Sequence, residues 1–136
     1  MSIKGADIRN IAVIGHSGEG KTSVCEAILF NGKATDRLGK VTEGTTVTDS
    51  DEQEIARKMS ISLGVAYAMW EGVKLNLLDV PGFYDFEGEE NEALRAAGGA
   101  LIVTGATGTL SVGAEKAIDK CLKNKIPMVV DRKSVV

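Results

Sequence analysis

One eight-residue segment limits what this chain can fold into more than any other feature of its sequence. Residues 15–22 read Gly-His-Ser-Gly-Glu-Gly-Lys-Thr, which fits the phosphate-binding pattern G-x-x-x-x-G-K-[ST]. The apolar run at residues 11–14 precedes this segment, and residues 21–30 follow it with apolar side chains at helical spacing. A buried strand that leads through a glycine-rich turn into a helix is the context this pattern requires. The sequence therefore predicts a phosphate-binding loop.

The chemistry expected of this loop follows from its residue types. Glycines let the backbone curl so that successive N–H groups point at an anion, and the following helix adds the positive end of its dipole. Lys21 is expected to reach the β- and γ-phosphates of a nucleoside triphosphate, and the Thr22 hydroxyl to bind Mg²⁺. His16 is expected to pack or to hydrogen-bond rather than to act as a base. The expected nucleotide contacts in this segment are His16, Ser17, Gly18, Glu19, Gly20, Lys21, Thr22 and Ser23.

The rest of the pattern predicts a sheet with helices on both faces. Residues 60–70 alternate in hydrophobicity, and Glu71-Gly72 links them to a second apolar run at residues 73–78, which indicates an antiparallel hairpin. Two further helices and two further strands are expected, at residues 87–97, 111–124, 101–103 and 128–130. Alternating strands and helices predict an α/β fold of the P-loop NTPase class, with three layers and a mostly parallel sheet that has one antiparallel edge strand.

Two segments outside the loop are expected to complete the site. Asp79 ends a predicted strand and begins Asp-Val-Pro-Gly, where a carboxylate beside the phosphate loop can hold Mg²⁺ through water. Gly82 has no Cβ, so its N–H can approach a γ-phosphate. The polar segment 32–58 has no sustained period, and loops in this position order around the γ-phosphate and its Mg²⁺. Ser60 follows it as a candidate hydroxyl ligand, so the expected metal ligands are Thr22, Ser60 and Asp79.

Composition narrows the class of protein. The chain has 136 residues, of which 43% are hydrophobic and 26% charged, as expected for one globular domain. Its net charge of -3 argues against a broad basic surface for nucleic-acid backbones. No apolar run approaches ~18 residues, so we expect a cytoplasmic protein without a membrane partner. Cys25 and Cys121 lack metal-ligand spacing and are expected to be small, semi-buried apolar residues.

Together these motifs resemble the start of the GTPase domain of elongation factor G and its elongation-factor-G-like relatives, which are ribosome-associated translational GTPases. The resemblance covers residues 7 to about 130. It is carried by residues 8–11, 15–23, 26–30, 32–33, 44–46, 49, 52–54, 79–82 and 85–86. It implies that the nucleotide is GTP or GDP, that Mg²⁺ is the metal and that the full-length protein contacts the ribosome. It also implies that Lys21 and Gly82 take part in catalysis.

Three positions depart from the pattern of that family. Gly18 stands where the family usually has an Asp that supports monovalent-cation binding, and Ser60 stands where it has its Mg²⁺-binding Thr. Phe83 stands where the family places its catalytic His. A phenyl ring cannot orient or polarise the attacking water, so slow hydrolysis and the elongation-factor-G-like branch are expected.

The resemblance ends near residue 130. Relatives continue their last strand into an N-K-x-D motif that reads guanine, whereas residues 131–136 here do not match it. We expect a partial domain at residues 1–130, incomplete at its C-terminus, a foreign or truncated tail at 131–136, and self-association through an exposed sheet edge. Two alternatives stay open. One is a non-hydrolysing, nucleotide-dependent binding module, which Phe83 favours; the other is a P-loop ATPase or kinase.

Overall fold

A computed structural model describes residues 3–16, 18–40, 43, 45–48, 63–82, 87–106 and 108–133. After a short 3-10 helix, η1 (Gly5–Asp7), the elements in chain order are β1 (Ile8–Ile14), α1 (Lys21–Asn31), β2 (Gly64–Trp70), β3 (Val73–Asp79), α3 (Glu87–Ala96), β4 (Gly99–Gly105), α4 (Val112–Lys123) and β5 (Met128–Lys133). Among the described residues, no helix is long and apolar enough to cross a membrane.

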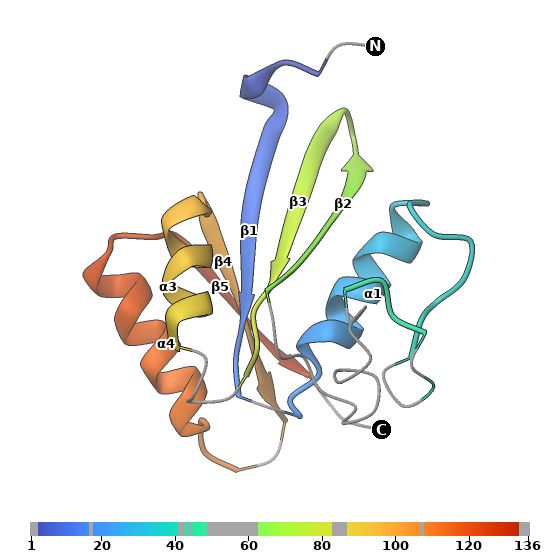
Figure 1. Ribbon diagram of the computed structural model, residues 1–136. Helices are drawn as coiled ribbons and strands as arrows, with labels where there is room; N and C mark the ends of the chain where they lie inside the picture. The colour runs from blue at the N-terminus through green and yellow to red at the C-terminus, as the bar shows by residue number, and fades with distance from the viewer. Residues whose placement is uncertain are drawn as a thin grey trace.

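The strands form one sheet in the order β2-β3-β1-β4-β5. β1 pairs in parallel with β3 and β4, and β4 pairs in parallel with β5. β2 lies at one edge and runs antiparallel to β3. The predicted α/β class, with a mostly parallel sheet and one antiparallel edge strand, is confirmed. Because β1, β3 and β4 are parallel, their carboxyl ends meet at one edge of the sheet (Figure 1), where the register pairs Val13 of β1 with Asp79 of β3.

Helices cover the sheet on both faces, which gives three layers (Figure 1). α1 packs its Cys25 and Leu29 on one face, against side chains that include Val13 and Leu77. α3 and α4 pack on the other face, where Cys121 is buried. Both cysteines are fully buried and reduced, which agrees with their predicted role as small apolar residues.

The β2–β3 hairpin has the predicted two-residue turn. Glu71 and Gly72 have φ values of 48° and 81°, and two successive positive values match the twist of the flanking strands. The alternation along β2 is also real, but its small residues face α1, with Ala68 buried. The larger side chains of Val65 and Tyr67 are 64% and 57% exposed, on the face of β2 that no helix of the described residues covers.

The strand β5 runs beyond the apolar residues that predicted it. Asp131 pairs with Val103 and Arg132 with Thr104, so part of the expected tail continues the register of the sheet. The Arg132 guanidinium also donates to the carbonyl of Ala106 at 2.7 Å. Charged residues are common on edge strands, where only one side of the strand is paired.

Candidate functional site

The loop between β1 and α1 has the backbone that its glycines predict. Gly18 and Gly20 have φ values of 80° and 91°, in the left-handed region that other residues rarely adopt. Gly20 is the N-cap of α1, and a glycine N-cap offers no side-chain acceptor to the first N–H groups of the helix. The loop therefore presents a helix N-terminus suited to binding an anion.

Two charged side chains of the loop are held by its own backbone. The Lys21 ammonium donates to the carbonyl of His16 at 2.9 Å, and the Lys21 residue is only 6% exposed. The Glu19 carboxylate accepts the His16 N–H at 2.9 Å. His16 packs against the start of α4, where a Cβ added to Gly113 would stand 3.0 Å from the His16 Cα. His16 thus packs against α4 and hydrogen-bonds through its backbone.

Three oxygen-bearing side chains meet beneath the loop. The Thr22 hydroxyl donates to the Asp79 carboxylate at 2.8 Å, which joins the start of α1 to the end of β3. The Thr48 hydroxyl donates to the same Asp79 oxygen at 2.9 Å. All three residues are buried, and Asp79 is fully so. The sequence predicted that Thr22 and Asp79 would lie together, but it contained no signal for Thr48.

This oxygen set fits the metal expected from sequence. Mg²⁺ prefers oxygen ligands and usually binds through one or two protein groups together with water and phosphate oxygens. A threonine hydroxyl on the first helix and an aspartate on a neighbouring strand are the protein groups used for this purpose beside a phosphate loop. Thr22 and Asp79 have these types and this placement.

A second buried carboxylate attaches the polar segment after α1 to that helix. Glu26, 1% exposed, accepts the N–H of Gly39 at 3.1 Å and the N–H of Val47. Around Gly39 the backbone is so close that an added Cβ would stand 2.5 Å from the Glu26 carboxylate. The chain thus holds this part of the segment through its own contacts, whereas the sequence predicted ordering by a γ-phosphate.

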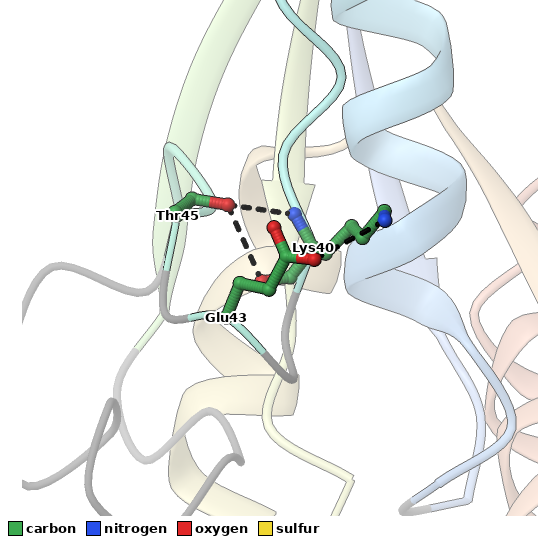
Figure 2. A network of polar contacts seen from close by, with 3 residues as sticks. All are labelled: Lys40, Glu43 and Thr45. Carbon is green, nitrogen blue, oxygen red and sulfur yellow. Dashed lines mark hydrogen bonds and ion pairs between the residues drawn. The ribbon is translucent and has the colours of Figure 1, made fainter.

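The same segment is further organised by a polar network at its surface. The Lys40 N–H donates to the Thr45 hydroxyl at 3.0 Å, and the Lys40 ammonium pairs with Glu43 at 3.2 Å (Figure 2). Lys40 and Glu43 are both exposed, so the ion pair contributes little. The network does hold the Thr45 hydroxyl on the backbone of Lys40.

The other predicted site residues are placed as follows. Ser23 lies in the first turn of α1, and Gly82 follows Pro81 just beyond the carboxyl end of β3. Ser17, Ser60 and Phe83 lie outside the described residues.

Comparison with known proteins bears on the same residues. The family model of the elongation factor Tu GTP binding domain matches residues 6–131. An elongation factor G-like protein of Mycobacterium tuberculosis (strain CDC 1551 / Oshkosh) is 42% identical over 123 residues, which make up 90% of this chain and 17% of that protein. The mitochondrial ribosome-releasing factor 2 of Drosophila willistoni is 36% identical over 125 residues, 92% of this chain and 17% of that protein.

A solved structure gives the same result. A crystal structure of a Thermus thermophilus protein superposes with a TM-score of 0.86 at 40% identity, covering 93% of this chain and 19% of that one. The chain thus spans less than a fifth of the length of the relatives it matches. The resemblance drawn from the motifs is confirmed.

Proposed function

This chain belongs to the elongation factor Tu GTP-binding domain family, as a GTP-binding domain of the elongation-factor-G-like kind, and from that premise we propose a Mg²⁺-dependent switch. In this proposal the protein binds GTP and GDP in the cytoplasm, acts at the ribosome and hydrolyses GTP slowly. The observation that carries the proposal is the hydrogen bond between Thr22 and Asp79 directly after a phosphate loop.

Each residue has a part in that proposal. Lys21 and the N–H groups of residues 16–23 hold the phosphates, and the Gly82 N–H senses the γ-phosphate. Thr22 and Asp79, with Ser60, hold Mg²⁺. When bound, this ion neutralises charge on the β- and γ-phosphates. Lys21 must leave the His16 carbonyl to reach a phosphate, which exchanges a neutral acceptor for a charged one and strengthens the contact.

Titration calorimetry tests the metal dependence directly. We expect GTP to bind at millimolar Mg²⁺ and to bind at least tenfold more weakly in EDTA, since a contact to a charged group contributes ~1.5–3 kcal/mol. Equal affinity in the two buffers would contradict the assignment of Thr22 and Asp79 to the metal.

Slow hydrolysis rests on Phe83 at the position of the family's catalytic His. In the full-length protein with ribosomes, Phe83→His should raise single-turnover GTP hydrolysis by ~10²–10⁴-fold, the usual contribution of a placed acid–base group. Phe83→Leu removes the ring without adding a polar group and should leave the rate unchanged. If the unmodified protein already hydrolyses GTP as fast as the histidine variant, slow hydrolysis is wrong. If neither form hydrolyses GTP, the non-hydrolysing binding module becomes the better description.

Base selection is a separate question, because the proposed partial domain at residues 1–130 lacks the N-K-x-D region. A guanine is fixed by hydrogen bonds to a charged group worth ~1.5–3 kcal/mol, so the 136-residue chain should bind GTP and ATP with similar, weak affinity. Side-by-side titration with both nucleotides tests this. Tight and strongly GTP-selective binding would show that guanine recognition resides within these residues.

Self-association through a sheet edge is also part of the proposal. β5 forms one edge of the sheet, and unpaired N–H and C=O groups on an edge strand can pair with a second chain. Sedimentation should therefore show a mass that rises with protein concentration. A constant monomer mass up to high concentration would contradict it.

A further inference from the structure

A cavity lies at the end of the sheet opposite the phosphate loop. It has a volume of about 560 Å³ and lies between the last turns of α3 and the segment that links α4 to β5, beside the amino ends of β4 and β5. α3 and α4 both end on this side of the molecule (Figure 1). We propose that this cavity binds a small organic phosphate through Arg95 and Lys125. The inference concerns a second site and does not depend on GTP binding.

The charged groups of this cavity are cationic. Of the described residues that line it, Arg95 and Lys125 are basic and none is acidic, although the whole chain has more acidic residues (19) than basic ones (16). Within the part of the chain that the structure describes, neither side chain makes a hydrogen bond or an ion pair. Both cations therefore have donors that a ligand in the cavity can use.

The helix ends beside the cavity have their carbonyl groups occupied. Free carbonyls at a helix C-terminus carry partial negative charge, which would repel an anion. Here the Ala96 carbonyl at the end of α3 accepts from the Asn10 side chain at 3.0 Å. Near the end of α4, the Lys120 carbonyl accepts from the Asn124 side chain at 2.8 Å. Because other groups bond these carbonyls, the two cations of the cavity are not needed to satisfy them.

The polar groups of the cavity match a phosphate monoester. Such a group carries about −1.5 to −2 charges at pH 7 and has three strong acceptor oxygens. The Arg95 guanidinium can donate two parallel N–H bonds to one phosphate, and the Lys125 ammonium is a second charged donor. The side chains of Asn91 and Asn124 line the same cavity and add neutral polar groups. A carboxylate carries one charge and would leave one of the two cations uncompensated.

Apolar residues form the rest of the lining, which points to an organic group on the phosphate. They are Leu94, Ala97, Ile126 and Pro127. Pockets for small molecules have volumes of about 300–1,000 Å³ and combine apolar walls with a few polar groups that fix orientation. Inorganic phosphate would leave this apolar lining unused. Phenyl phosphate, which joins an apolar ring to a phosphate, is therefore a suitable probe.

An NMR titration of backbone amides with phenyl phosphate at low salt tests the site. The Gly98 and Lys125 amides should shift and saturate with a Kd of about 1 mM or lower, within the usual range for a ligand of this size. Lys21→Ala should retain these shifts, because Lys21 lies at the other end of the sheet. Inorganic phosphate and benzoate should both bind more weakly than phenyl phosphate.

Two variants with a matched control locate the phosphate. Lys125→Asn removes the charge with a residue that tolerates the φ of 55° at this position, and it should weaken phenyl phosphate about fivefold. Arg95→Gln should weaken it to a similar extent. Lys123→Gln removes an exposed cation from the last turn of α4 that does not line the cavity, and it should change nothing.

The possible results separate this site from the phosphate loop. Shifts confined to the Gly18 and Gly20 amides, or no saturable shift at Gly98 and Lys125, would overturn the proposal. Unchanged affinity in both Lys125→Asn and Arg95→Gln would also overturn it. Benzoate binding as tight as that of phenyl phosphate would contradict a phosphate site, and equally tight inorganic phosphate would contradict an organic ligand. None of these results bears on the proposed binding of GTP.

Discussion

Gly15 lies directly against Val103 of the neighbouring strand. A Cβ added to Gly15 would stand 2.2 Å from the Val103 carbonyl oxygen, a distance that real Cβ atoms essentially never show. The first glycine of the phosphate-binding pattern is therefore required by the close approach of β4 to the end of β1. Packing within the sheet therefore requires glycine at position 15, in addition to any requirement from phosphate binding.

Gly15→Ala tests that requirement. Because the atom in the way belongs to the backbone, the loop has to shift, and overpacking of this kind costs ~1–3 kcal/mol of the free energy of unfolding. Gly105→Ala is the control, since nothing lies within 4 Å of its added Cβ. Denaturant unfolding and GTP titration should both show a loss for Gly15→Ala alone. Equal behaviour of the two variants would mean that the approach of Val103 imposes no constraint.

The Glu19 carboxylate places a negative charge in a loop that is proposed to bind phosphates. Glu19→Gln keeps an oxygen to accept the His16 N–H and removes the charge. GTP affinity should rise by up to about fivefold at low salt, as expected for a partly exposed charge pair of ~1 kcal/mol or less, and the gain should shrink at high salt. Glu43→Gln, at an exposed residue paired with Lys40, should change nothing. Weaker binding by Glu19→Gln would show that its charge supports the loop.

Cys121 should make stability depend on alkaline pH. Burial, and to a lesser extent the nearby charge of Glu90, raise the pKa of the Cys121 thiol from 9.0. The folded chain therefore resists forming the thiolate more than the unfolded chain does. The stabilisation is complete below pH ~9 and is lost as pH rises through the higher folded pKa.

Unfolding curves measured from pH 8 to 10.5 check this effect. The loss of stability across that range should be smaller in Cys121→Val than in the unmodified chain. Cys25→Val makes the same substitution in the core on the other face of the sheet and controls for the change in packing. An identical pH dependence in Cys121→Val and the unmodified chain would contradict the raised pKa.

The site could be predicted from sequence where local chemistry fixes it. Gly18 and Gly20 adopt left-handed backbone that few other residues tolerate, so the loop is readable from a short pattern. Thr22 and Asp79 are 57 positions apart, yet the order of strands and helices brings them together. Thr48 and Glu26 follow no pattern, because their partners are set by the path of a loop with no repeating spacing.

The sequence predicted the fold class, but it did not predict which faces of the strands are covered by helices. Alternation predicted β2, but which of its faces is buried depends on where helices lie over the sheet, and the face with Tyr67 is exposed while the face with Ala68 packs against α1. Strands β1 and β4 extend beyond the apolar runs that predicted them, at residues 11–14 and 101–103, for a similar reason. β1 begins at Ile8, before its apolar run, because the ladder pairs Ile8 with Lys74. Pairing, rather than hydrophobicity, sets these ends.

Lys21 provides the most direct test of a triphosphate site in this loop. It is the buried cation of the loop, and its contact with phosphate is expected to contribute ~1.5–3 kcal/mol. Lys33→Ala removes an exposed cation just beyond α1 and serves as the control. The measurement is a calorimetric titration of GTP with Mg²⁺ into the unmodified chain, Lys21→Ala and Lys33→Ala. We predict that Lys21→Ala loses detectable binding while Lys33→Ala retains it. Unchanged GTP affinity in Lys21→Ala would contradict the assignment of residues 15–22 as the phosphate-binding loop.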